Sequence, residues 1–158
     1  MNKGMNNRLK GNLLVVGQFI LIALLILVPS SGLDTGAFSF FLTAFSIVLL
    51  LAGFVILGLS ALALGKSLTA HPIPGKNAVL VTDGLYRFVK HPIYSGLLLV
   101  AVGLTIAGGF FPHALFLIAL TFLLNYKASF EEALLAKSYA GYAEYSKKTG
   151  RFVPRLIR

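Results

Sequence analysis

Two groups of polar side chains stand out from an otherwise apolar chain, and both are of types that bind or react. The first lies in "VTDGLYRFVKHPIYSG", residues 81–96. The second is Lys127, followed four residues later by the adjacent carboxylates Glu131 and Glu132. Carboxylates that face several cations suit a polar, zwitterionic ligand, because the carboxylates accept from an ammonium group while the cations hold an anion. The first group comprises Tyr86, Arg87, Lys90, His91 and Tyr94.

The composition places both groups in a membrane protein. The chain has 158 residues, of which 57% are hydrophobic and 12% charged, about half the charged fraction of a soluble domain. Its net charge of +9 fits basic loops at a membrane surface better than a nucleic-acid partner, because no nucleic-acid-binding motif accompanies it. The lack of cysteine excludes disulfides, thiolate metal sites and a cysteine nucleophile. The three histidines lie far apart, so we expect no metal site.

Long apolar runs predict a polytopic all-α bundle with about four transmembrane helices. The first run follows a basic start and is interrupted only by Gln18. No small-residue cleavage site follows it, so we expect an uncleaved spanning helix rather than a secretory signal. Gly53 and Gly58 in the second run either allow close helix packing or are simply tolerated there. The four runs cover residues 13–28, 37–64, 93–111 and 113–124.

The distribution of basic residues predicts which ends of these helices share a membrane face. All Lys and Arg lie before the first run, in the polar interval 65–92, or after Asn125. By the positive-inside rule, both termini and this interval are cytoplasmic. The third and fourth runs are joined by a short uncharged turn and should form an antiparallel helical hairpin. We therefore expect the two polar groups to meet at the cytoplasmic face.

The tail after Asn125 is expected to continue the fourth helix on the cytoplasmic side. Ala, Leu, Lys and Glu dominate residues 127–140, and all of them favour helix. Lys127 and Glu131 are four residues apart, so they share a helix face. Three tyrosines then follow at a spacing of three, which we interpret as an interfacial aromatic belt. They are Tyr139, Tyr142 and Tyr145.

The two polar groups also carry a family pattern. "GLYRFVKHPIYSG" resembles the signature Gly-x-Tyr-x-x-x-Arg-His-Pro-x-Tyr-x-Gly of the isoprenylcysteine carboxyl methyltransferase family and its phospholipid N-methyltransferase relatives. A downstream Glu-Glu pair with spaced tyrosines and an Arg-Phe-x-Pro ending resembles their second motif. The resemblance covers about residues 75–155. The second motif is represented here by Glu131, Glu132, Leu135, Tyr139, Gly141, Tyr142, Tyr145, Arg151, Phe152 and Pro154.

The resemblance implies an integral membrane methyltransferase that uses S-adenosylmethionine. With the length and the apolar runs, we expect one membrane domain, 1–158, in which residues 1–64 form two N-terminal spans and residues 65–158 the methyltransferase core. The cofactor would enter from the cytoplasm, and a lipophilic acceptor would come from the bilayer, by a route that we place between the second and third helices. The implied cofactor-binding residues are Val81, Gly84, Tyr86, Arg87, His91, Pro92, Tyr94, Glu131 and Glu132.

These residue types suit S-adenosylmethionine chemically. The two carboxylates accept from its ammonium group or ribose hydroxyls, and Tyr86 and Tyr94 offer π faces to a cationic or aromatic group. Backbone amides around Gly84 and Tyr86 are expected to reach the adenine or the amino-acid head. Pro92 begins the third helix, whose free amides suit the cofactor carboxylate.

Two departures from the family pattern leave the methyl acceptor open. Lys90 and Lys127 stand where the family usually has Arg. Lys keeps the positive charge but cannot form the bidentate hydrogen bonds of a guanidinium. Arg87 is a candidate to supply the missing guanidinium. Lys127 is the expected catalytic contact for an acceptor carboxylate, with Glu131 orienting it. For an amine acceptor, Glu131 would be the base, and a thiol acceptor is a further alternative. Outside methyl transfer, the alternatives are an NADPH-dependent isoprenoid or sterol reductase and a non-enzymatic membrane adaptor.

Overall fold

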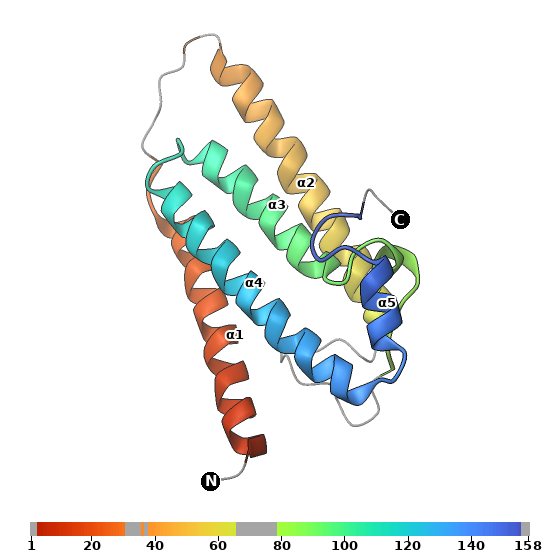
Figure 1. Ribbon diagram of the computed structural model, residues 1–158. Helices are drawn as coiled ribbons and strands as arrows, with labels where there is room; N and C mark the ends of the chain where they lie inside the picture. The colour runs from red at the N-terminus through yellow and green to blue at the C-terminus, as the bar shows by residue number, and fades with distance from the viewer. Residues whose placement is uncertain (1–2, 31–35, 37, 66–78, 156–158) are drawn as a thin grey trace.

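The computed structural model describes residues 3–30, 36, 38–65 and 79–155, and every regular element in that part of the chain is a helix (Figure 1). This confirms the predicted all-α bundle. The stretch 66–78, which belongs to the polar interval 65–92, lies outside the described residues. The elements are α1 (Lys3–Leu27), α2 (Phe38–Leu64), the 3-10 turn η2 (Gly84–Arg87), α3 (Pro92–Ala107), α4 (His113–Ser138) and α5 (Tyr142–Lys148).

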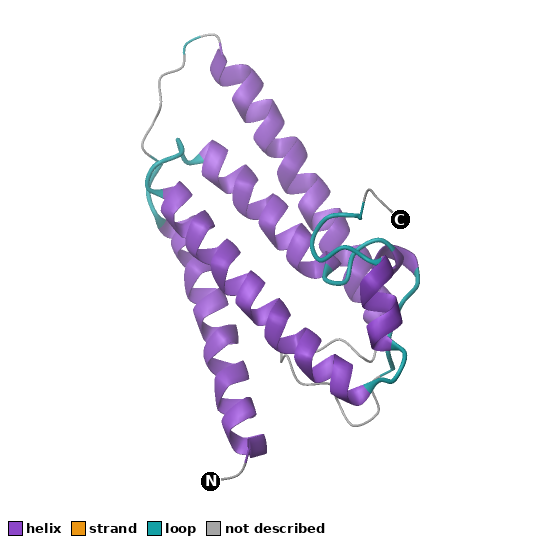
Figure 2. Cartoon of the chain, in the orientation of Figure 1, coloured by secondary structure: helices purple, strands orange, loops and turns teal. Residues whose placement is uncertain are grey.

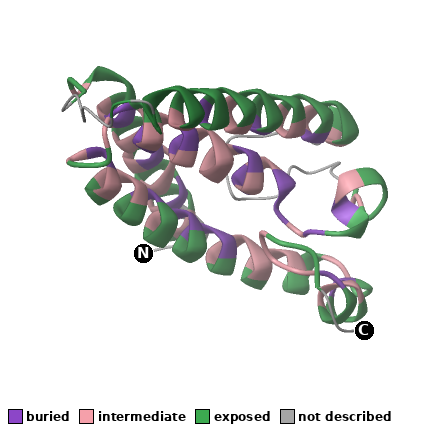
Figure 3. Ribbon diagram, turned by 90° about the horizontal axis from the view of Figure 1, so that it is seen from above, coloured by how far each residue is buried: buried purple, intermediate pink, exposed green. Residues whose placement is uncertain are grey.

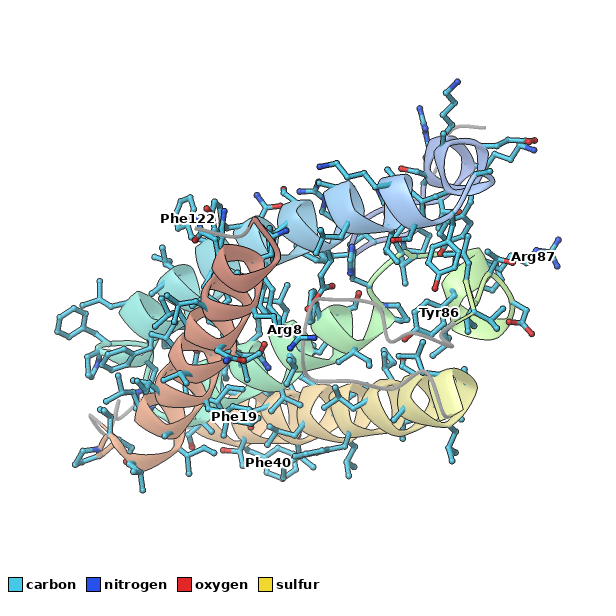
Figure 4. All side chains as sticks on the ribbon, turned by 90° about the horizontal axis from the view of Figure 1, so that it is seen from below. Arg8, Phe19, Phe40, Tyr86, Arg87 and Phe122 are labelled. Atoms are coloured by element: carbon cyan, nitrogen blue, oxygen red, sulfur yellow. The ribbon has the colours of Figure 1, made fainter. Side chains whose placement is uncertain are left out.

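Among the described residues, three helices are long and apolar enough to cross a membrane: α1, α2 and α4. Their outward side chains are apolar, as a lipid environment requires; Phe40 and Phe122 are each 73% exposed and point away from the bundle (Figure 4). Figure 3 shows the same division, with exposed positions on the outer faces of the helices and buried ones between them. The chain is therefore a membrane protein.

The third predicted span is shorter than its apolar run suggested. The run continues to residue 111, but α3 has 16 residues and ends at Ala107, a length of about 24 Å against a hydrocarbon core of about 30 Å. Gly109 and Phe110 then adopt positive φ angles of 82° and 70°, which a right-handed helix cannot continue. The resulting turn joins α3 to an antiparallel α4 (Figure 2), as the hairpin prediction required.

The pair α2–α3 is held by direct backbone approach at glycines. A Cβ on Gly53 would lie 2.8 Å from the carbonyl oxygen of Gly96, and one on Gly103 would lie 3.0 Å from that of Ser46. A Cβ on Gly58 would have no heavy atom within 4 Å, so this glycine is merely tolerated. The acceptor route that we placed between these two helices is wrong along this contact, because the two backbones leave no passage there.

The fourth apolar run and the polar tail form one continuous helix, α4, which confirms that the tail extends the hairpin. α4 packs against α1 around the buried side chains of Leu25, Leu120 and Leu124. Gly17 allows the close approach, because a Cβ there would lie 2.9 Å from Leu123 Cδ1. In Figure 1, the α1–α4 and α2–α3 pairs lie next to one another, joined by the α3–α4 hairpin.

After α5 the chain turns back toward the beginning of α3. We call residues 149–155 the return segment. Its backbone pairs with the residues before α3: Lys90 N–H donates to Gly150 O at 2.8 Å and His91 N–H to Arg151 O at 3.1 Å, while Gly150 N–H donates to Phe88 O at 3.3 Å. The return segment therefore lies beside the first polar group of the sequence.

The glycine contact predicts unequal effects of one chemical change at two positions of α2. Gly53→Ala should lower the free energy of unfolding by about 1–3 kcal/mol, because the added methyl group meets backbone atoms that cannot move alone. Gly58→Ala, the matched control, should be neutral or stabilise by up to about 1 kcal/mol through helix propensity. Thermal unfolding in detergent measures both. Equal effects of the two substitutions would contradict the close packing of α2 on α3.

Candidate functional site

The hairpin brings the two predicted polar groups together at His91. Its Nδ1 lies 3.3 Å from Glu131 Oε2, and its Nε2 lies 3.2 Å from Glu132 Oε1. His91 immediately precedes α3, while the two glutamates lie on α4 past the middle of the helix. The predicted meeting of the groups is therefore observed, with the imidazole between adjacent carboxylates.

Glu132 is the most heavily engaged side chain of this cluster. Lys90 Nζ donates to its Oε2 at 3.0 Å, and Arg151 donates through Nε to Oε1 at 2.9 Å and through Nη2 to Oε2 at 3.2 Å. With the His91 contact, four donors meet one carboxylate, which has about four acceptor positions. Glu132 therefore has little acceptor capacity left for the direct cofactor binding that we expected. Its contacts are those of an anchor, a residue that holds Lys90, His91 and Arg151 together.

Glu131 differs from its neighbour, because it keeps acceptor capacity. Tyr94 Oη donates to Glu131 Oε1 at 2.5 Å, and His91 contacts Oε2. Two partners leave about two of its four acceptor positions for other donors. An ammonium group or a ribose hydroxyl is the kind of donor that such a carboxylate accepts.

The surroundings of His91 favour its charged form. Both ring nitrogens face a carboxylate, so both serve as donors only when the ring is an imidazolium. Burial by itself would lower the pKa of His91, but the hydrogen bonds and charges of Glu131 and Glu132 prevail and raise this pKa above its ordinary value of 6.5. The ring stacks on Tyr94 with centroids 5.2 Å apart, and Phe152 of the return segment packs edge-on against both rings.

Lys127 lies inside the bundle rather than at its surface. The residue is 2% exposed. Its Nζ donates to Gln18 Oε1 of α1 at 2.8 Å and lies 5.1 Å from the centroid of the Tyr94 ring. The Tyr94 ring thus contacts both Lys127 and His91, and its hydroxyl reaches Glu131. The participation of Gln18 was not predicted; its polarity within an apolar run was the only signal in the sequence.

The remaining predicted cofactor contacts are placed unevenly. Pro92 is fully buried at the first turn of α3. Val81 is half-buried and Gly84 is exposed. The sequence predicted that the backbone amide of Tyr86 would reach the cofactor, but this amide donates to Asp83 O at 3.0 Å. Arg87 is exposed and points away from the helices (Figure 4).

The guanidinium of the cluster therefore comes from Arg151 and not from Arg87. Besides its hydrogen bonds to Glu132, Arg151 donates through Nη1 to Asn125 Oδ1 at 2.6 Å and to Ser129 Oγ at 3.1 Å. The return segment is further fixed by Ser95 Oγ, which donates to Phe152 O at 2.6 Å. Sequence reasoning placed Arg151 and Phe152 in a motif but could not give them partners.

The interpretation of the tyrosines as an interfacial belt is wrong for two of them. Tyr142 is 3% exposed, and Tyr145 Oη donates to Tyr86 O at 2.7 Å. Burial, with a contribution from Glu132, raises the pKa of Tyr145 to about 12. The spacing of three places these residues on a short helix, α5, which contacts the residues before α3 through Tyr145 and Tyr86.

The donor and acceptor set suits the cofactor that the family pattern implies. Glu131 has acceptor capacity for an ammonium group or hydroxyls, and the stacked rings of His91 and Tyr94 form an aromatic wall. The buried hydroxyl of Tyr142 has no hydrogen-bond partner in the described part of the chain. A buried hydroxyl normally finds a partner, so a bound polar ligand would complete it.

The raised pKa of His91 predicts a pH-dependent stability. A raised folded-state pKa contributes stability that is fully present below the unfolded value of about 6.5 and is lost as pH rises through the folded value. The unfolding temperature of the protein in detergent should therefore fall over that interval. His91→Gln, which does not titrate, should lack this component of the pH profile. Parallel profiles for the two proteins would contradict the imidazolium.

Comparison with known proteins bears on the same residues. The sequence model of a family described as phospholipid methyltransferase matches residues 36–141. Two metal-resistance proteins are similar: the cobalt-zinc-cadmium resistance protein CzcN of Cupriavidus metallidurans, 38% identical over 106 residues (63% of this chain, 47% of CzcN), and the nickel-cobalt-cadmium resistance protein NccN of Alcaligenes xylosoxydans xylosoxydans, 34% identical over 103 residues (63% and 48%).

A protein-S-isoprenylcysteine O-methyltransferase of Schizosaccharomyces pombe is 34% identical over 83 residues, which cover 51% of this chain and 35% of the relative. The matches thus span about half or less of the length of these curated relatives. The family match covers more than half of this chain, including His91, Lys127 and both glutamates of the cluster. This confirms the resemblance expected from the two motifs: the chain belongs to the phospholipid methyltransferase family.

Proposed function

We propose that the protein transfers a methyl group from S-adenosylmethionine to a lipophilic acceptor that enters from the bilayer, with a carboxylate as the acceptor group, as in isoprenylcysteine carboxyl methylation. The observation that carries the proposal is the pair formed by His91 and Glu131 inside the region matched by the family. The isoprenylcysteine methyltransferase relative supports the carboxylate acceptor. The basic residues around the cluster support a cytoplasmic active site with both termini on that side.

The chain's own residues divide the work between a cofactor side and an acceptor side. When bound, S-adenosylmethionine would supply an electrophilic methyl carbon: the acceptor would bond to this carbon as its bond to sulfur breaks, and S-adenosylhomocysteine would leave. Glu131 binds the donors of the cofactor, and the Tyr94 hydroxyl fixes the orientation of that carboxylate. Glu132 holds His91, Lys90 and Arg151 in place around it. Alignment and the exclusion of water are the main contributions that such a site makes to methyl transfer.

Lys127 favours a carboxylate acceptor over an amine. A carboxylate is already a nucleophile and needs no base, only a cation that holds one oxygen while the other attacks. In its protonated form, Lys127 offers an ammonium beside the Tyr94 ring inside the bundle, where low dielectric strengthens its attraction for an anion. The same charge would repel a protonated amine. Phospholipid N-methylation and thiol S-methylation are therefore the second candidates.

Ligand binding distinguishes two other candidate functions from methyl transfer. A membrane reductase would bind NADPH, and the names of CzcN and NccN raise a part in metal resistance. Among the described residues, no group of three or more His, Cys, Asp or Glu side chains is arranged to hold a metal ion. The absence of a metal site stays a prediction, as do the absence of a nucleic-acid partner and the single domain 1–158 with its core in residues 65–158.

Titration of S-adenosylhomocysteine into the detergent-solubilised protein tests the proposal. The protein should bind this product of methyl transfer and not NADPH. Glu131→Gln should weaken binding about tenfold or more, because a charge-assisted hydrogen bond contributes about 1.5–3 kcal/mol. Glu144→Gln is the matched control, since Glu144 is exposed and, in the part of the chain that the structure describes, forms its ion pair with Lys148; this variant should bind within about twofold of wild type.

Either of two results would refute the assignment. One is NADPH binding without S-adenosylhomocysteine binding, which would favour the reductase. The other is an equal effect of Glu131→Gln and Glu144→Gln, which would remove Glu131 from the cofactor site. A screen for labelled methyl transfer to membrane lipids and prenylcysteine mimics then identifies the acceptor.

A further inference from the structure

Gln18 is a buried polar residue in the middle of a membrane helix. It is the one interruption of the apolar run 13–28, and it is 8% exposed within the bundle. Polar side chains are rare in such segments, because an unsatisfied amide in hydrocarbon is costly, and those that remain face a partner or a functional site. Gln18 lies in α1, which is outside the region matched by the phospholipid methyltransferase family.

Its partner is the cation proposed to hold the acceptor. Gln18 Oε1 accepts from Lys127 Nζ at 2.8 Å. Lys127 in turn lies over the Tyr94 ring, and the Tyr94 hydroxyl donates to Glu131. A continuous series of contacts thus leads from Gln18 on α1, through Lys127 and Tyr94, to Glu131, the carboxylate that is proposed to bind the cofactor.

The packing of α1 on α4 fixes Gln18 at this point. Gly17, its neighbour in sequence, has no side chain to separate the helices, and a Cβ there would lie 2.9 Å from Leu123 Cδ1. Two turns further along, Leu25 is buried in the same core as Leu124. The amide therefore approaches Lys127 from a rigid surface rather than from a loop.

We propose that Gln18 is a positioning residue that holds the Lys127 ammonium where an acceptor carboxylate binds, so that α1 forms part of the acceptor side of the site. This rests on the proposed function. A neutral amide serves the purpose, because its oxygen directs the ammonium without neutralising it. A carboxylate at position 18 would pair with Lys127 and compete with the anionic acceptor. An apolar residue there would leave the ammonium without this acceptor atom.

Methyl transfer to N-acetyl-S-farnesylcysteine by the purified full chain in detergent tests the inference. Gln18→Glu should raise the KM for this probe about tenfold or more, with the Kd for S-adenosylhomocysteine within about twofold of wild type. Gln18→Leu should act in the same direction. In a Lys127→Met background, Gln18→Leu should change the KM by less than twofold, because the two residues act through one contact. Thr121→Val, an exposed polar-to-apolar change on α4, is the control and should behave as wild type.

Thermal unfolding gives a readout that does not depend on activity. Gln18→Leu should lower the unfolding temperature by removing an acceptor from a buried ammonium. Adding Lys127→Met should restore it, since two apolar residues then replace the polar pair. A merely structural Gln18 would lower kcat and stability without the selective rise in KM, and its effect would add to that of Lys127→Met.

The outcomes separate this inference from the proposed function. Wild-type protein that binds no S-adenosylhomocysteine refutes the methyltransferase and the inference with it. Protein that binds S-adenosylhomocysteine but neither binds nor methylates the farnesylcysteine probe refutes the carboxylate acceptor and hence the role of Gln18. Normal methyl transfer with Gln18 variants that keep the wild-type KM, or with additive effects in the Lys127→Met background, overturns the inference alone.

Discussion

Glu132 joins three segments of the chain that are far apart in sequence. Its carboxylate receives Lys90 and His91 from the residues before α3 and Arg151 from the return segment, while its own backbone belongs to α4. Removing one partner from this partly buried group of charges would leave the remaining charges incompletely paired, which destabilises the arrangement. The arrangement of the site therefore depends on this carboxylate being fully paired.

The other parts of the site follow from that anchor. With one face of the imidazolium ring on Tyr94 and both nitrogens engaged, His91 cannot turn, and Tyr94 is set to orient Glu131. Adjacent carboxylates on one helix thus have different tasks: Glu132 holds the surrounding cations, and Glu131 keeps acceptor capacity for a ligand. The close glycine contacts between α2 and α3 hold α3 in place. α1 supplies Gln18, which accepts a hydrogen bond from Lys127.

Much of this architecture could be predicted from the sequence, because long apolar runs and a short turn leave few arrangements. The hairpin, the continuation of α4 and the meeting of His91 with Glu131 all follow from local patterns. The partners of Arg151 and Gln18 could not be predicted, since each contact joins residues on different elements whose packing the sequence does not state. Periodicity alone also misplaced Tyr142 and Tyr145, because a spacing of three is shared by a surface belt and by a short helix that covers a site.

We propose that Glu131 binds the cofactor while Glu132 stays paired with its cations. An experimental structure of the protein with S-adenosylhomocysteine tests it most directly. A donor of the ligand should lie within hydrogen-bond distance of Glu131, and the pairing of Glu132 with Lys90, His91 and Arg151 should be unchanged. A ligand that contacts Glu132 after displacing Arg151, or one bound away from Glu131, would contradict it.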